Sequence, residues 1–311
     1  MRFKMVKHYT NFNIKKIHRG SIILIGNFDG LHLGHQKLFQ LAQSYKKKYN
    51  LKIGVVNFDP MPKMFFNNKL KNFRLSNINQ KIKLLNNLKV DFVITKRFDK
   101  KFSKTKALNF ISQILNKKLS SKFIFVSNNF RFGNKREGNV NLLKRYEQLF
   151  NYQVVKPEPL IKSKKIVSSS LIRNLLEKGL LDKANNLLKR NWTIQGVVKR
   201  GRQVGKKIGF PTCNIDIGNY VLAKPGVYAV KVLRKNSKKY LKGIANLGYR
   251  PTFNQKKILL EVHLFNFSGN LYNKLLSVEF LKFIRKEKKF NNVNQLRSQI
   301  IKDLNIAKKT K

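Results

Sequence analysis

Two histidines with a glycine between them stand at the start of a predicted helix near the N-terminus. The segment from Gly26 to His35 reads GNFDGLHLGH and follows a predicted strand. The unpaired N–H groups and the dipole of a helix N-terminus favour anions, and Gly34 leaves room for a phosphate to approach. His32 and His35 could stabilise the charge that develops on phosphates during nucleotidyl transfer. The alternative is a turn with two surface histidines, but the strand–loop–helix context favours the chemistry.

A glycine-rich basic loop is the second candidate for phosphate chemistry. It runs from Lys199 to Asn214 and reads KRGRQVGKKIGFPTCN. The loop is not a Walker A motif, because that motif's glycine spacing and GK[ST] ending are absent. Exposed backbone N–H groups of such a loop could still cradle phosphates. The alternative is a flexible lysine-rich hairpin loop.

A run of three serines precedes an arginine in the segment SSSLIR, from Ser168 to Arg173. Hydroxyl groups at a helix start can cap its N–H groups, and an arginine one turn later can form a bidentate fork with a triphosphate. An ordinary helix cap followed by an amphipathic helix would give the same pattern. The histidine motif in the same chain favours the phosphate role.

The expected elements place these motifs in two domains. Strands at 22–25, 51–57, 91–95, 122–126 and 152–155 alternate with helices at 35–49, 77–88, 105–116 and 140–150, and a further helix starts at 168–170. This alternation predicts a parallel sheet, which binds ligands beyond the carboxyl ends of its strands. After residue 187, runs at 193–198, 226–233, 239–247, 258–267 and 276–284 predict an antiparallel barrel or sandwich, followed by a helix over 292–307. We therefore expect domains at 1–186 and 187–311.

Composition limits the class of protein. The only cysteine is Cys213, so an intrachain disulfide and a cysteine zinc cluster are excluded. The longest aliphatic run, residues 22–25, is far shorter than the roughly 20 residues of a membrane helix, and the N-terminus lacks an apolar signal segment. We expect a cytoplasmic protein that has no membrane partner.

The net charge of +53 comes from 67 lysines and arginines against 14 aspartates and glutamates. A surface that binds nucleic acid would concentrate this charge, whereas here the basic residues are spread evenly along the chain. Lysine and asparagine, which AT-rich codons encode, are both abundant. Compositional drift is therefore favoured over a specific nucleic-acid partner.

These motifs resemble those of the bacterial bifunctional riboflavin kinase/FAD synthetases, over essentially the whole chain. The adenylyltransferase half of that family carries the G-x-F-D-G-x-H-x-G-H segment, an F-x-P-H-P segment, an F-R-F-G segment and an S-S-T/S-x-I-R segment. Here the last three read FDPMP at 58–62, FRFG at 130–133 and SSSLIR at 168–173. Met61 replaces the usual histidine and Ser127 the usual glycine. Methionine cannot donate a hydrogen bond to a phosphate, so adenylylation is expected to survive in weakened form.

The kinase half of the family carries G-x-P-T-A-N, which matches Gly209 to Asn214 with Cys213 in place of alanine. Segments at 243–253 and 261–267 also match. In the family, the threonine and asparagine of this motif help to bind the Mg²⁺ that accompanies ATP. Phosphoryl transfer also needs a carboxylate to accept the proton of the ribityl hydroxyl. Glu279, on a predicted strand between apolar neighbours, is the expected base.

The resemblance implies an α/β plus all-β fold, with a Rossmann-like nucleotidyltransferase domain and a C-terminal antiparallel β-barrel. It implies that riboflavin and ATP give FMN, and that FMN and ATP give FAD and pyrophosphate, with Mg²⁺ required. The expected catalytic residues are His32, His35 and Glu279. Residues expected to contact ATP phosphates are Gly26, Phe28, Asp29, Gly34, Ser168, Ser169, Arg173, Gly201, Lys206 and Gly209. Expected flavin or nucleotide contacts are Asn128, Asn129, Asn246 and Arg285, and the expected metal ligands are Thr212 and Asn214.

Two alternatives remain open. Met61 could leave a riboflavin kinase with an impaired adenylyltransferase domain. The strong positive charge could instead belong to a polyanion-binding protein on a relict enzyme fold.

Overall fold

A computed structural model of the chain describes residues 5–201, 205, 208–235, 237–251 and 256–310. The chain divides into two compact units, which are taken one at a time below. The first contains residues 1–71 and 78–168, and the second contains residues 72–77 and 169–311. None of the helices in the described ranges combines the length and the apolar composition that crossing a membrane requires.

The first unit is built on a parallel sheet, as expected. Six strands of the described chain lie in the order β1-β4-β3-β2-β5-β8. Their bounds are β1 (Lys7–Tyr9), β2 (Ile22–Ile25), β3 (Ile53–Asp59), β4 (Phe92–Arg97), β5 (Phe123–Phe125) and β8 (Gln153–Val155). The order reverses at β2, which pairs with β3 on one side and with β5 on the other. Such a switch point is where open α/β sheets bind ligands.

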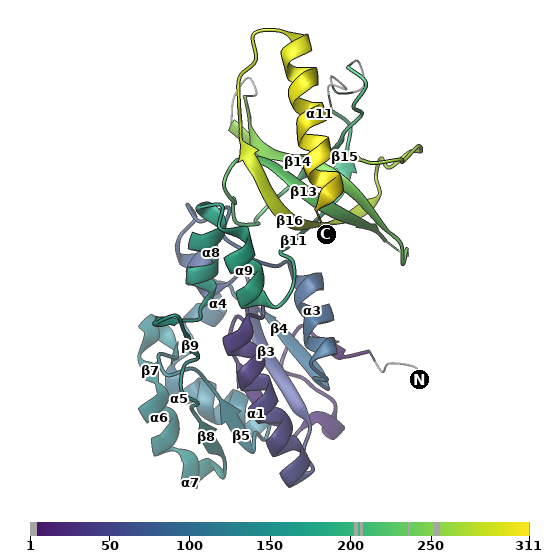
Figure 1. The fold of residues 1–311 in the computed structure, drawn as a ribbon. Coiled ribbons are helices and arrows are strands. Elements are labelled where there is room, and N and C mark those ends of the chain that lie inside the picture. Colours follow the sequence, from purple (N-terminus) through teal and green to yellow (C-terminus); the bar gives the residue numbers. More distant parts are fainter. Residues whose placement is uncertain (1–4, 202–204, 206–207, 236, 252–255, 311) are drawn as a thin grey trace. The chain divides into compact units, whose positions relative to one another are not determined.

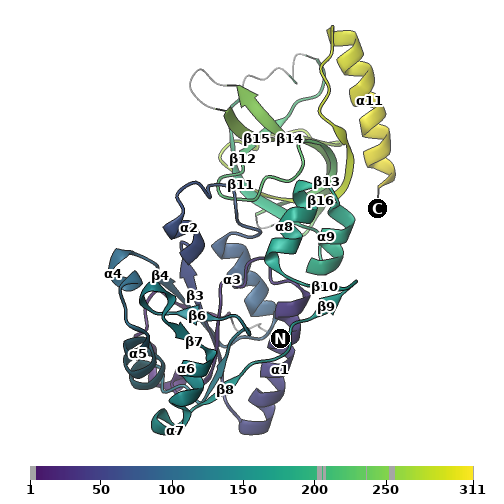
Figure 2. The same ribbon diagram turned by 90° about the vertical axis from the view of Figure 1, so that its left-hand side faces the viewer.

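Helices cover both faces of this sheet (Figures 1 and 2). One face packs against α1 (Leu33–Tyr49) and α3 (Ile78–Asn87), through a cluster that includes Phe39 and Leu85. The other face packs against α5 (Ala107–Asn109), the π-type helix η2 (Phe110–Lys118) and α6 (Val140–Arg145). The remaining elements of this unit are η1 (Lys16–His18), α2 (Pro62–Phe66), α4 (Lys100–Ser103), β6 (Arg131–Phe132), η3 (Asn134–Arg136), β7 (Gly138–Asn139), α7 (Glu147–Phe150), β9 (Ile161–Lys162) and β10 (Lys165–Ile166).

The second unit is a closed barrel, which confirms the antiparallel domain expected from the sequence. Its strand order is β11-β12-β15-β14-β13-β16, and each pairing is antiparallel. The bounds are β11 (Thr193–Lys199), β12 (Cys213–Asp216), β13 (Gly226–Arg234), β14 (Tyr240–Pro251), β15 (Lys256–Leu264) and β16 (Leu275–Lys286). Alternate residues such as Val278 and Phe280 are fully buried, and those between them face outward.

Three longer helices of the described residues and a short strap also belong to the second unit. The helix α11 (Val293–Lys309) lies on the outside of the barrel (Figure 1). Its Ala307 packs against Ala229 and Ile244. Two more helices, α8 (Ser169–Glu177) and α9 (Leu181–Leu188), precede the barrel. The strap, residues 72–77, packs with this unit: the Trp192 indole N–H donates to the Leu75 carbonyl at 3.1 Å. The functional division expected between residues 186 and 187 stays a prediction.

Candidate active sites

The histidine motif occupies the switch point of the first unit. Its loop follows β2, and α1 begins at Leu33, so His32 is the N-cap of that helix. The Nδ1 atom of His32 accepts the backbone N–H of His35 at 3.4 Å. A backbone amide can only donate, so the proton of neutral His32 lies on Nε2. The sequence therefore places one imidazole N–H donor beside the N-terminus of a 17-residue helix.

His35 lies against His32, with ring centroids 3.7 Å apart and nearly parallel planes. The Phe28 ring also packs against His35 in a T-shaped arrangement, with 5.2 Å between centroids. Burial holds the pKa of His35 well below 6.5, and the neighbouring titratable groups of His32 and Lys81 lower it further. His35 is therefore a neutral imidazole at pH 7, and it can donate one N–H but carries no charge.

Close backbone packing explains the glycine between the histidines. A Cβ atom on Gly34 would lie 3.2 Å from the His32 ring and 3.2 Å from the carbonyl oxygen of Val167. The residues just before Ser168 therefore lie against the motif. Phe28 and Asp29 of the same loop are buried, and a Cβ atom on Gly26 would lie 3.2 Å from the Phe28 ring. Residues of the loop itself fill the space beneath it, so the loop holds the start of α1 in place.

A pocket of about 120 Å³ opens among the elements that follow β3 and β5 in the first unit. Its walls are aromatic: Phe58, Phe66, Phe98, Phe102, Phe110, Phe130 and Phe132. Its rim is basic, with Arg131, Lys135 and Arg136. The FRFG segment thus supplies both aromatic and cationic groups. Apolar walls with a cationic rim suit a planar ring system that carries a phosphate.

The other expected residues of this half have different surroundings. Asn128 and Asn129 are exposed after β5, and the Asn129 side chain accepts the Ser127 hydroxyl at 3.0 Å. Ser168 ends the first unit, whereas Ser169 and Arg173 lie on α8 in the second. Within that unit, the Nε of Arg173 donates to the Phe73 carbonyl at 2.6 Å and its guanidinium stacks on the Phe73 ring at 3.7 Å.

Met61 is buried in the first unit, with a side chain that is 2% exposed. Its carbonyl oxygen accepts the N–H groups of Met64 and Phe65, so the residue is the N-cap of α2 through its backbone. The methionine at this position thus serves helix formation and packing.

In the second unit, five outward-facing residues form one row across the barrel. The register aligns Asn214 with Glu261, Glu261 with Asn246, Asn246 with Val227, and Val227 with Arg285. Four of the five, together with Thr212, line a pocket of about 300 Å³ that α11 closes on one side through Leu296 and Ile300. Asn214 is the member of the row outside that lining. The structure therefore brings together three of the expected site residues, Thr212, Asn246 and Arg285, and adds Glu261.

Asn214 is buried beside this pocket and its Oδ1 atom has no hydrogen-bond partner among the described residues. A Cβ atom on Gly201 would lie 2.2 Å from the Asn214 amide nitrogen, so the loop backbone passes directly over the side chain. An amide oxygen and a hydroxyl, from Asn214 and Thr212, are ligands that suit Mg²⁺. The residues present therefore fit a divalent ion.

The basic loop is described in part. Phe210 donates its N–H to the Gly205 carbonyl at 2.7 Å, and Gly209 has a φ of +88°, which favours glycine. Lys206 lies outside the described residues. No group of three His, Cys, Asp or Glu side chains that could hold a metal ion occurs in the described chain.

Arg285 is committed to an ion pair. Its Nε lies 3.0 and 2.9 Å from the two carboxylate oxygens of Asp303, and its Nη2 lies 2.8 Å from Oδ2. Gln299 also donates to Asp303, whose side chain is 2% exposed. This pair ties α11 to β16 and so fixes one wall of the pocket.

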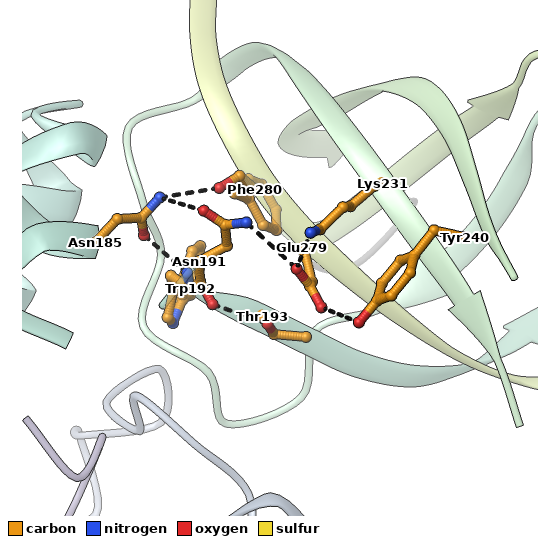
Figure 3. Close-up of polar contacts among 8 residues, drawn as sticks. All are labelled: Asn185, Asn191, Trp192, Thr193, Lys231, Tyr240, Glu279 and Phe280. Carbon is orange, nitrogen blue, oxygen red and sulfur yellow. Dashed lines mark hydrogen bonds and ion pairs between the residues drawn. The ribbon is translucent and has the colours of Figure 1, made fainter. Parts of the chain in front are cut away.

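Glu279 belongs to a different part of the barrel surface. Its carboxylate accepts the Tyr240 hydroxyl at 2.7 Å and the Asn191 amide at 3.3 Å, and it pairs with Lys231 at 3.2 Å (Figure 3). The hydrogen bond to this carboxylate, and burial after it, raise the pKa of Tyr240 to about 12. Glu279 does not line the pocket that holds Thr212 and Asn246.

Comparison with known proteins assigns both units. The family model described as FAD synthetase matches residues 14–171, and the model described as riboflavin kinase matches residues 188–311. A Buchnera aphidicola (subsp. Schizaphis graminum) protein named bifunctional riboflavin kinase/FMN adenylyltransferase is 42% identical over 96% of each chain. This chain belongs to that family.

Other members of the family are similarly related. The proteins of that name from Haemophilus influenzae and Escherichia coli K12 are 40% and 37% identical, and the matches cover 95% and 91% of this chain and 96% and 90% of theirs. A Streptococcus pneumoniae crystal structure titled macrolide-efflux protein has the same fold, with a TM-score of 0.86, 26% identity, and 99% and 100% coverage of the two chains. Members of both families depend on ATP and generally need a divalent metal ion.

Sequence reasoning missed two features of these sites. Glu261 stands in a strand with the same alternation as Glu279, and only the register places it between Asn214 and Asn246. A signal was present, because Glu261 opens the segment 261–267 that resembles the family. The aromatic pocket had a weaker signal in the phenylalanines of FDPMP and FRFG.

Proposed function

We propose that this chain makes FAD in two steps at two sites. The second unit phosphorylates riboflavin with ATP to FMN, and the first adenylylates FMN with ATP to FAD and pyrophosphate. The relatives named bifunctional riboflavin kinase/FMN adenylyltransferase support both steps. The observation that carries the proposal is the presence of two separate phosphate-type sites, one at the N-terminus of α1 and one beside Asn214.

In adenylylation, a phosphate oxygen of FMN attacks the α-phosphorus of ATP and pyrophosphate leaves. His32 and His35 donate Nε2–H groups to the phosphate oxygens, where negative charge grows in the transition state. The N-terminus of α1 adds its dipole and free N–H groups. Gly34 keeps the approach open, and Gly26, Phe28, Asp29 and Ser168 shape the loop around the phosphates.

The aromatic pocket is the proposed place for the flavin of FMN. Its phenylalanines offer faces and edges for the isoalloxazine ring, and its basic rim offers charge for the phosphate. Asn128 and Asn129 follow β5 on the same side of the sheet and could donate to the flavin or the nucleotide. Ser169 and Arg173 are proposed to contact the triphosphate.

In the kinase step, the ribityl hydroxyl of riboflavin attacks the γ-phosphorus of ATP and ADP leaves. We place the base on Glu261 instead of Glu279, because Glu261 lines the pocket with Thr212 and Asn246. A carboxylate there would accept the hydroxyl proton within hydrogen-bond reach. Asn246 would orient the flavin, and Gly201, Lys206 and Gly209 would contact the ATP phosphates. Arg285, which lines the same pocket, would contact the flavin or the nucleotide, and its ion pair with Asp303 would hold α11 in place.

Mg²⁺ is the proposed divalent ion. Thr212 and Asn214 would hold it, and their oxygens suit a small hard cation that keeps most of its other ligands from phosphates and water. When bound, the ion would neutralise charge on the transferred phosphate. Domains at 1–186 and 187–311 and a cytoplasmic location belong to the same proposal.

The test is a product assay. Purified protein is incubated with ATP and MgCl₂, with riboflavin in one reaction and FMN in another, and the flavins are separated by chromatography. FAD in both reactions is the expected result. If the first reaction gives FMN and the second gives no FAD, the chain is a riboflavin kinase without adenylyltransferase activity, which is the alternative that Met61 raises. No product from folded protein would refute the enzyme assignment.

A further inference from the structure

An asparagine lies inside the apolar layer beneath the histidine motif. Ile53 and Val55 of β3 belong to the cluster that packs against α1 and α3, so strand alternation directs Asn57 to the same face. Asn57 has no exposed surface, and neither its amide oxygen nor its amide nitrogen has a partner among the described residues. The Nδ1 atom of His35 is likewise buried without a described partner.

Topology brings these two groups together. Gly26 donates to the Val56 carbonyl at 3.1 Å, so the end of β3 lies beside the start of the histidine loop. The helices α1 and α3 each precede the next strand of the sheet and run antiparallel to it. Their first turns, which carry His35 and Lys81, therefore lie over the carboxyl end of β3, where Asn57 is.

Leaving such groups unpaired has a cost. A buried polar group without a hydrogen bond destabilises a protein by about 1–3 kcal/mol, and an aliphatic side chain would suit this layer better. A water molecule held by a small set of polar atoms removes that cost. The amide of Asn57 and the Nδ1 of His35 provide a donor and two acceptors for one.

We propose that Asn57 is a positioning residue for His35, through one bound water molecule that donates to Nδ1 and so holds the ring proton on Nε2. This inference rests on the proposed adenylylation. A neutral imidazole has a single N–H, and the partner at one nitrogen decides which nitrogen carries it. The backbone N–H of His35 sets the tautomer of His32 in the same way, by donating to its Nδ1 atom. Both rings then present Nε2–H to the phosphates.

The titratable neighbours of His35 allow the proposed role of Asn57 to be tested by varying pH. His32 and Lys81 are the titratable groups that face His35, and both lower its pKa, after burial. A carboxylate in place of the Asn57 amide would favour the protonated ring and raise that pKa. Asn57→Asp is therefore expected to make His35 titrate at a higher pH than in the native chain, which the ring ¹⁵N chemical shifts measure.

The experiment compares Asn57→Leu and Asn57→Asp with Ser121→Ala. Ser121 is equally buried and its hydroxyl also lacks a described partner, but it lies at the amino end of β5. With Asn57→Leu, the rate of FAD formation from FMN should fall about 10–100-fold, the range found for residues that orient a histidine ligand. Riboflavin phosphorylation by the same chain should not change, and Ser121→Ala should leave both rates unchanged.

A second readout does not depend on activity. Long-range ¹H–¹⁵N spectra of ¹⁵N-histidine protein report the tautomer of each ring. In the native chain His35 should be the Nε2–H form, and in Asn57→Leu a mixture. A native tautomer in the variant, or native adenylylation, would overturn the proposal. If the native chain makes no FAD, the adenylylation proposal fails, whereas the spectra still decide whether Asn57 sets the ring.

Discussion

Replacing Glu261 by glutamine tests which carboxylate serves the kinase. The amide keeps the shape of the side chain but cannot accept the ribityl proton. Removal of a general base costs about 10²–10⁴-fold in rate, which equals about 2.7–5.4 kcal/mol of transition-state stabilisation. Riboflavin phosphorylation by Glu261→Gln should fall within that range, and adenylylation of added FMN should stay native because its site lies in the other unit.

The matched variant is Glu279→Gln. The register on β13 separates the two glutamates. Lys231 pairs with Glu279, whereas Val227 pairs with Asn246, which in turn pairs with Glu261. Val227 and Lys231 are four residues apart along β13, or about 13 Å at 3.3 Å per residue. A proton acceptor must come within about 3 Å of its hydroxyl, so Glu279 cannot serve the same hydroxyl. Its replacement removes a partly exposed ion pair, worth about 0.2–1 kcal/mol of stability, and should leave the kinase rate within a factor of two.

The assay is the initial rate of FMN formation at saturating ATP and MgCl₂, followed by chromatography. Both variants have a folded barrel if the fluorescence of Trp192, which is buried in the second unit, changes under denaturant as it does in the native chain. A near-native rate for Glu261→Gln together with a rate for Glu279→Gln about 10²-fold lower would refute the register argument. That result would identify Glu279, the residue expected from the sequence, as the base.

Three further predictions follow from single contacts. Gly34→Ala should lower FAD formation from FMN and leave riboflavin phosphorylation native, because its Cβ atom would press on the histidine ring. Asp303→Asn leaves a half-buried arginine without its carboxylate and should cost about 3–5 kcal/mol in unfolding free energy; the fluorescence of Trp192, the only tryptophan, reports it under denaturant. Glu279→Gln should lower the Tyr240 pKa from about 12 toward 10, because the carboxylate that stabilises the neutral phenol is gone; ultraviolet titration measures the shift, and an unmoved midpoint would contradict the contact.

Local pattern predicted most of the fold. Alternating apolar runs found the barrel strands except β12, whose four residues follow a glycine-rich loop and include two polar side chains. The strand β1 was also missed, because its three residues carry no buried pattern. The histidine motif was placed correctly at the start of α1, since a strand, a glycine loop and a helical period are all local signals.

Long-range pairing explains what the sequence did not predict. The choice of Glu279 rested on its flanking apolar residues, and these are alike for both glutamates. Which carboxylate reaches the pocket depends on strand register, which a strand's own sequence does not encode. Likewise, the sequence did not indicate the carboxylate partner of Arg285, because Asp303 lies 18 residues further on, in α11.

The positive charge of the chain makes the neighbours of Glu279 and Glu261 worth comparing. With 67 cations and 14 acids, a carboxylate on this surface readily acquires a lysine, as Glu279 has done with Lys231. Lys231 and the Tyr240 hydroxyl both contact the carboxylate of Glu279. Glu261 has an asparagine on each neighbouring strand in register, Asn214 and Asn246. Register therefore sets two amide side chains beside the carboxylate of Glu261, and the same two asparagines are the proposed contacts of the metal ion and the flavin. At the other proposed phosphate site the expected donors are likewise uncharged groups of the chain, namely an imidazole N–H and the backbone N–H groups at the N-terminus of α1.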